Sequence, residues 1–139
     1  MSDPYDLSRF VDAQAPSYER ALEEIRGGRK VSHWIWYVFP QIDGLGSSPT
    51  ARRFAIKSLE EAAAYDVHPM LGPRLRESVA ALMGQPARDP HAIFGSPDDL
   101  KVRSCLTLFE RAARDPAPFA EALEAFYVGE RDEETLKRL

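Results

Sequence analysis

The sequence predicts an all-α fold, a single multihelical domain over residues 1–139 with roughly six to eight helices joined by short loops. Three observations predict it. Apolar residues recur at helical spacing through most of the chain. Asp-Pro and Ser-Pro pairs, which are typical of helix starts, precede several of these stretches. Glycines follow several of them, as is common at helix ends.

Five pairs of residues are expected to start helices, because an Asp or Ser oxygen accepts hydrogen bonds from first-turn amides and proline at the first position loses no bond. The pairs are Asp3-Pro4, Ser48-Pro49, Asp89-Pro90, Ser96-Pro97 and Asp115-Pro116.

Apolar stripes at helical spacing predict the helices between these expected starts. In chain order, the stripes are Tyr18, Leu22 and Ile25, ended by Gly27 and Gly28; Ala55, Leu59, Ala62 and Ala63 in one helix after Pro49; Leu75, Val79 and Leu82, ended by Gly84; Val102, Cys105, Leu106, Phe109, Ala112 and Ala113 after Pro97; and Ala120, Leu123, Phe126 and Tyr127, ended by Gly129. The segment DEETLKRL places acidic residues in its first turn and basic residues in its last, as a helix dipole favours.

The run WIWYVF, residues 34–39, is the exception to this pattern. Its composition favours a β-strand. The chain contains no second comparable run, however, and a lone strand has nothing to pair with. We therefore expect a short, wholly buried helix from Ser32 to Phe39, ended before Pro40. If this interpretation were wrong, the fold would contain a small sheet.

Composition restricts the class of protein. With 139 residues, 44% of them hydrophobic and 29% charged, the chain can form one hydrophobic core. The one cysteine, Cys105, cannot form an internal disulfide, which suits a reducing cytoplasm. The start, MSDPYDLSRF, lacks the apolar region of a signal peptide, and no apolar run reaches the roughly 20 residues that span a bilayer. We therefore expect a cytoplasmic protein with no membrane partner.

The segment GLGSSPTARR, residues 44–53, has the composition of an anion site. Gly44 and Gly46 allow a ligand to approach the backbone closely, Ser48 caps the expected helix, and Arg53 adds positive charge near its amides. The segment matches neither a Walker loop nor a dinucleotide fingerprint. The alternative is a glycine turn into a capped helix with solvated arginines. Arg74 could extend the positive region, or be an ordinary surface arginine.

The aromatic segment before residue 44 contains side chains that could pack on a ligand ring or transfer a proton. His33 is a candidate acid or base, Trp36 could pack on a ring, and the amide of Gln41 could bind a polar ligand edge. The alternative is that the aromatic residues fill the core and that His33 bonds only to backbone.

A third element follows Pro97. Asp98, Lys101, Ser104 and Thr107 recur about every three residues and are expected to form a polar row beside an apolar stripe. Lys101 and Ser104 would orient a ligand, and Asp98 would supply the carboxylate for hydrolysis of a glycosidic bond. The alternative is a solvated helix face. The scattered histidines lack metal-ligand spacing, so no metal or other cofactor is predicted.

Four runs of the sequence resemble an uncharacterised bacterial family, domain of unknown function eighteen-ten, from Leu7 to Leu136. The runs are HWIWYVFPQIDGLGSS, EAAAYDVHPMLGPRL, IFGSPDDLKVRSCLTLF and YVGERDEETL. The chain departs from the family pattern at Asp66, usually a leucine, and at Cys105, often a serine. The resemblance implies a multihelical domain and no established activity. The family's recurring residues coincide here with His33, Trp34, Trp36, Phe39, Pro40, Gln41, Gly44, Gly46, Ser48, His68, Pro69, Gly72, Arg74, Asp98, Lys101, Ser104 and Thr107.

These residues lead to one preferred function and two alternatives. The preferred function is a protein that binds, and in one version hydrolyses, an anionic nucleotide or ADP-ribose-like ligand. The ADP-ribose part rests only on an analogy of fold with small all-helical glycosidases. The first alternative is a non-catalytic protein-interaction module, for which the sequence identifies no partner. The second is weak nucleic-acid binding through Arg52, Arg53, Arg74 and Arg76, against which the net charge of −4 argues.

Overall fold

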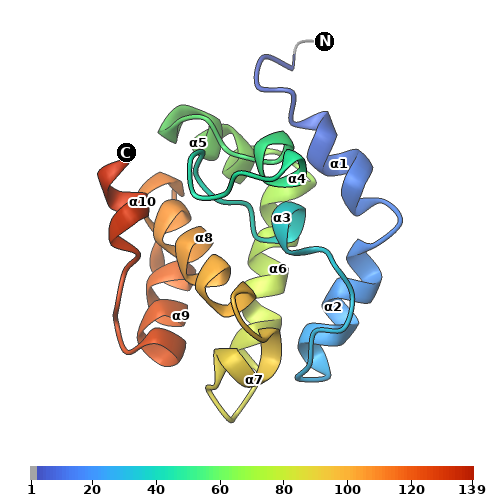
Figure 1. Ribbon diagram of the computed structural model, residues 1–139, viewed down its shortest axis with the longest axis vertical. Coiled ribbons are helices and arrows are strands. Elements are labelled where there is room, and N and C mark those ends of the chain that lie inside the picture. Colours follow the sequence, from blue (N-terminus) through green and yellow to red (C-terminus); the bar gives the residue numbers. More distant parts are fainter. Residues whose placement is uncertain (1–2) are drawn as a thin grey trace.

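Helices make up the regular structure of the computed structural model, which describes residues 3–139 (Figure 1). Within that range there are ten, more than the six to eight predicted, because several are only four or five residues long. They are α1 (Ser8–Gln14), α2 (Tyr18–Arg26), α3 (Ile35–Val38), α4 (Pro49–Arg53), α5 (Leu59–Val67), α6 (Leu71–Met83), α7 (Pro90–Phe94), α8 (Asp98–Ala112), α9 (Ala117–Tyr127) and α10 (Glu133–Lys137).

The core is organised around α8, the longest helix of the described chain. All residues of α8 from Ser104 to Phe109 are buried, because the helix is covered by α5 and α9 and also contacts α3, α7 and α10. The rings of Tyr65, Phe109 and Phe119 pack in series with centroids 5.3 and 5.9 Å apart. Figure 1 shows α6 between this group and α2, with which it also packs. The prediction of an all-helical fold is confirmed.

The prediction of one long helix after Pro49 is wrong, because the helical structure is interrupted between α4 and α5. Ile56 lies buried in an extended stretch and forms an isolated parallel bridge with Ile42. Its amide donates to the carbonyl of Gln41 and its carbonyl accepts from Asp43, both at 2.8 Å. Ser58 then caps a new helix by accepting from the amide of Glu61. Long-range backbone pairing therefore overrides the local apolar spacing.

The WIWYVF segment is helical, but less of it than expected. Only α3 is regular, and the segment is not wholly buried, because Trp36 and Tyr37 are half-buried and His33 is exposed. Trp34 is buried, and its indole N–H donates to a carboxylate oxygen of Glu24 at 2.8 Å. One face of the segment therefore belongs to the core and the other reaches the surface.

The proline pairs mark helix starts with differing accuracy. Ser48 and Asp89 cap α4 and α7, as predicted, by accepting from the amides of Ala51 and Ala92. Pro97 and Pro116 lie one residue before α8 and α9. The expected start at Pro4 is wrong: α1 begins at Ser8, although Asp3 still accepts from its first-turn amides.

None of the helices within residues 3–139 is long and apolar enough to cross a bilayer.

Candidate functional site

The indole of Trp36 connects two segments that lie far apart in the sequence. The ammonium nitrogen of Lys101, on α8, lies 4.3 Å from the centroid of this indole. The edge of the indole faces the loop before α4, where a Cβ added to Gly46 would lie 3.0 Å from Cη2 of Trp36. The added Cβ would also lie 2.8 Å from Cβ of Ala51, so a side chain at position 46 would have to displace α4 and the ring. Trp36 thus brings the glycine loop and the start of α8 to one place.

A small hollow lies beside the indole. It is lined by Trp36, Gln41, Gly44 and Gly46, together with apolar residues of α4 and the adjoining loop, and its volume is about 10 Å³. That is about the room that one water molecule needs. Gln41 is 5% exposed, and its Nε2 is buried without a hydrogen-bond partner among residues 3–139. A residue that lines the hollow therefore has an unused donor.

Two lysines share one carboxylate at the start of α8. The Oδ1 atom of Asp98 lies 3.1 Å from Nζ of Lys101, and its Oδ2 atom lies 2.9 Å from Nζ of Lys30. Burial raises the pKa of Asp98, but the hydrogen bonds and charges of the two lysines lower it by more. Asp98 is therefore ionised at neutral pH and has no proton to donate. The group of three carries a formal charge of +1.

Lys30 and Glu24 belong to this neighbourhood, although the sequence analysis missed them. Lys30 is largely buried, donates to the carbonyl of Ser32 at 2.6 Å, and lies 5.1 Å from the centroid of the Trp34 ring. Glu24 accepts hydrogen bonds from Val31, Ser32 and Trp34. Glu24 lies in the last part of α2 and Lys30 in the loop that follows it, and no spacing rule relates either segment to α8. An acidic residue just before a Gly-Gly turn was the only available signal.

The structure separates Ser104 and Thr107 from the Trp36 site. Ser104 donates to the carboxylate of Asp132, and Thr107 accepts from the backbone amide of the same residue. Each three-residue step along a helix falls about 60° short of a full turn, so a row at this spacing turns away from its starting face. Asp98 and Lys101 therefore face Trp36, whereas Ser104 and Thr107 fix the start of α10.

Several other predicted residues also lie outside the Trp36 site. Arg74 donates to Gln14 at 3.3 Å and lies over the ring of Tyr18. Arg53 is exposed and lines a different groove together with Arg9 and Lys57.

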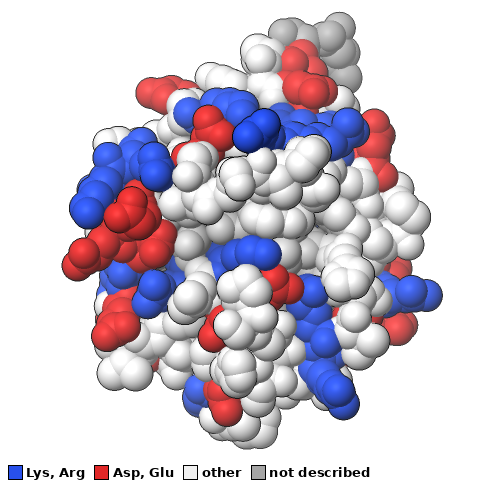
Figure 2. Space-filling view, viewed as in Figure 1, with Lys and Arg blue, Asp and Glu red and all other residues white. Residues whose placement is uncertain are grey.

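Figure 2 shows basic side chains gathered over α4 and the adjoining end of α1. Ser48 uses its hydroxyl to cap α4, a helix of only five residues, which gives little dipole for an anion. His33 lies exposed at the edge of the aromatic segment, where its carbonyl accepts from the hydroxyl of Tyr37.

The described residues favour neither a metal site nor a reactive thiol. Residues 3–139 contain no group of three or more His, Cys, Asp or Glu side chains arranged to hold a metal ion. Cys105 is fully buried in the core, and burial raises the pKa of its thiol. A raised pKa keeps the thiol protonated and unreactive at neutral pH.

Comparison with known proteins identifies one family and one similar structure. The family model described as "Protein of unknown function (DUF1810)" matches residues 4–139. The conserved hypothetical protein Rv1873 from Mycobacterium tuberculosis, solved by crystallography, is 51% identical with a TM-score of 0.96. The match covers 99% of this chain and 98% of that one. No curated protein matches the chain. Neither description specifies a ligand or a reaction.

Proposed function

Because the chain belongs to DUF1810, a family of proteins of unknown function, its function has to be argued from the site, and we propose that it binds a small anionic ligand beside Trp36. The ligand class is an anion that carries a planar ring, such as a nucleotide or an ADP-ribose-like molecule. One observation carries the proposal: the same indole lies under the ammonium group of Lys101 and against Gly46 of the glycine loop.

Lys101 is the residue that we propose contacts the anionic group. Its ammonium group has three N–H donors, and one is engaged with Asp98. Its side chain is 23% exposed, so solvent and ligands reach it. Lys30 offsets the charge of Asp98 from the buried side, which leaves the positive charge of Lys101 available. An ammonium group held in place by a carboxylate and an indole is well positioned for a phosphate or carboxylate group.

Gln41 and Trp36 are the residues that we propose select the rest of the ligand. The half-buried indole offers an apolar edge for a ring. The unused Nε2 donor of Gln41 requires an acceptor, because a buried donor without a partner costs about 1–3 kcal/mol. The hollow beside Gln41 is small, so the group that reaches it should be one acceptor atom, such as a ring carbonyl oxygen.

The geometry favours binding over hydrolysis. Both carboxylate oxygens of Asp98 are held by lysines. A glycosidase of the common type needs one protonated carboxyl group to assist the leaving group, and Asp98 does not meet that need because its pKa is lowered. Hydrolysis of an ADP-ribose-like ligand therefore remains the less supported version of the proposal.

A thermal-shift screen with ATP, NAD, ADP-ribose and inorganic phosphate tests the proposal. A ligand at 100 times its dissociation constant should stabilise the fold by about 2.7 kcal/mol and raise the melting temperature. In Lys101→Met the shift should largely disappear, because the anion contact is removed. The matched control is Lys57→Met, which removes an exposed lysine that pairs with Asp43 at 3.4 Å. The proposal fails if no ligand stabilises the wild type, or if both variants reduce the shift equally.

A further inference from the structure

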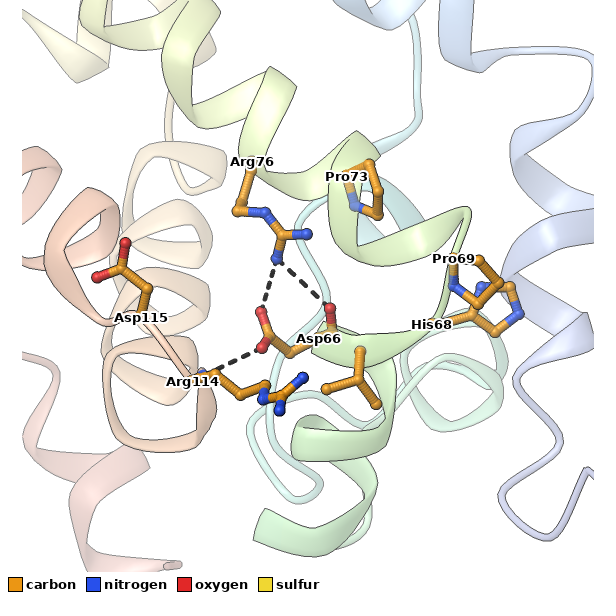
Figure 3. A pocket seen from close by; sticks show the side chains of 8 residues that line it. Asp66, His68, Pro69, Pro73, Arg76, Arg114 and Asp115 are labelled. Carbon is orange, nitrogen blue, oxygen red and sulfur yellow. Dashed lines mark hydrogen bonds and ion pairs between the residues drawn. The ribbon is translucent and has the colours of Figure 1, made fainter.

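We propose that a groove between the α5–α6 turn and the segment after α8 is a second binding site, which takes a small organic oxyanion. The groove measures about 350 Å³. It shares no lining residue with the hollow beside Trp36 and does not depend on the proposed function. The residues that matter are Asp66, His68, Arg76 and Arg114, with Asp115 and two prolines at the edges (Figure 3).

The acceptor atoms on the floor of the groove are already used. Oδ1 of Asp66 accepts from Nη1 of Arg76 at 2.9 Å, and Oδ2 accepts from the backbone amide of Arg114 at 3.1 Å. The backbone carbonyl of Asp66 also lies 3.4 Å from Nη1 of Arg76. Asp66 is only 5% exposed. Its carboxylate therefore positions Arg76 and the segment after α8, and is not available to bind a ligand.

His68 contributes a further donor, because its hydrogen bonds decide its tautomer. Nδ1 accepts from the amides of Met70 and Leu71, at 3.1 and 3.2 Å. An imidazole nitrogen that accepts hydrogen bonds carries no proton, so in the neutral ring the proton is on Nε2. Nε2 is therefore a donor, but Figure 3 shows the ring turned away from Arg76 and Arg114, so His68 lies at the edge of the groove and the arginines carry the proposal.

The arginines supply the remaining donors. The Asp66 carboxylate uses Nη1 of Arg76 and leaves Nε and Nη2 of that guanidinium group. Among residues 3–139, no acceptor bonds the guanidinium group of Arg114, since Asp66 is bonded by the backbone amide of that residue. Figure 3 shows this guanidinium group reaching back beneath Asp66. Arg114 is exposed and the side chain of Arg76 is 41% exposed, so the remaining N–H donors face solvent, from which an oxyanion can accept their hydrogen bonds.

The local backbone holds these donors in place. A Cβ on Gly72 would lie 2.0 Å from the carbonyl oxygen of Asp66, so the end of α5 approaches the start of α6 as only glycine permits. Val67, Pro69 and Pro73 add apolar surface to the groove. An oxyanion with a short carbon chain therefore fits better than a bare ion. Asp115, at the edge, opposes an anion by its charge.

Titration of the full chain with succinate and with inorganic phosphate, at matched ionic strength, tests the site. The readout is the backbone amide NMR shift of residues 66–76 and 113–115. Arg114→Gln should weaken binding roughly tenfold, the effect of losing one charged contact. The backbone amide that bonds Asp66 remains in this variant, so the fold should persist. The matched control is Arg111→Gln, an exposed arginine of α8 that does not line the groove.

Asp115→Asn should have the opposite effect on binding affinity. Asn keeps the oxygen that accepts from the amide of Ala117 but removes the negative charge, so binding should tighten several-fold. Succinate should bind more tightly than phosphate, and tighter binding of phosphate would overturn the choice of an organic oxyanion. The proposal is overturned if neither probe shifts these amides, if Arg114→Gln binds as the wild type does, or if Arg111→Gln weakens binding as much.

Discussion

Half-buried Glu24 and buried Gln41 show two opposite arrangements of a polar side chain. Glu24 accepts four hydrogen bonds, which join the end of α2 to the loop that leads to Trp34. Gln41 is buried with an unused donor. A buried polar group that is fully bonded rigidifies its surroundings, whereas an unbonded one is a cost that a ligand can remove. The first residue therefore supports the Trp36 site, and the second is available to act in it.

Replacement of Glu24 should lower stability and alter its dependence on pH. Burial raises the pKa of Glu24, but the hydrogen bonds from Ser32, Val31 and Trp34 outweigh this effect and lower the pKa to about 2 from a usual 4.5. A lowered folded-state pKa gives stability that is present above pH 4.5 and is lost as the pH falls toward 2.

Glu24→Gln should therefore cost about 1–3 kcal/mol at neutral pH, because a neutral amide cannot accept all these bonds equally well. Below the usual carboxyl pKa its deficit should shrink. Urea unfolding measured at neutral and acidic pH gives both quantities. Glu23→Gln, at an exposed neighbouring position, is the control. Equal stability losses in the two variants would contradict the assigned role.

The last helix, α10, shows how one element depends on another. Asp132 caps it by accepting from the amide of Thr135, and the same carboxylate accepts from Ser104 on α8. Thr107 of α8 accepts from the amide of Asp132. A helix of five residues is too short to be stable alone. The buried hydroxyls of α8 therefore keep α10 attached to the core.

Thr107→Val should loosen α10 while leaving the core volume nearly unchanged. The amide of Asp132 would lose its acceptor, at a cost of about 1–3 kcal/mol. Hydrogen–deuterium exchange should become faster at residues 133–137 and stay slow in the middle of α8. Thr50→Val, at an exposed position, serves as the comparison. Unchanged exchange in α10 would show that other contacts hold it.

An element can be predicted from the sequence where the interactions that form it are local. Caps such as Ser48 and Asp89 act within one turn, so the sequence predicted the starts of their helices correctly. The break at Ile56 arises from pairing with residues 41–43, and local spacing cannot show it. For the same reason local spacing shows neither the contact of Lys101 with Trp36 nor the roles of Lys30 and Ser104. All three depend on which distant loop or helix folds against α8.

At the scale of the whole molecule, one hydrophobic cluster unites residues from Leu7 to Tyr127. Helices from both halves of the chain contribute to it, because α5 and α6 pack on α8 and α9. A shared core couples the stability of its parts, so we propose that the chain folds as one domain. The two proposed binding sites lie at the edges of this core, where α3 and the α5–α6 turn reach the surface.

Unfolding should therefore be a single cooperative transition. Fluorescence of Trp34, which is buried, and of Trp36 reports on the neighbourhood of α3, whereas far-ultraviolet circular dichroism reports on all helices. The two signals should share one urea midpoint. A fluorescence midpoint at clearly lower urea would instead show that the aromatic segment unfolds separately from the rest.

The Ile42–Ile56 bridge has a consequence for how the molecule could respond to a ligand. It anchors both ends of the intervening chain to the buried interior, while Gly44 at positive φ and Gly46 beside the indole lie between those anchors. A rearrangement of the glycine loop in this tethered segment would alter the mouth of the Gln41 hollow and leave the helices outside the segment in place, while buried Phe54 holds α4 to the core. A conformational change at the Trp36 site can thus be confined to about a dozen residues, without lowering the local stability of the rest of the protein.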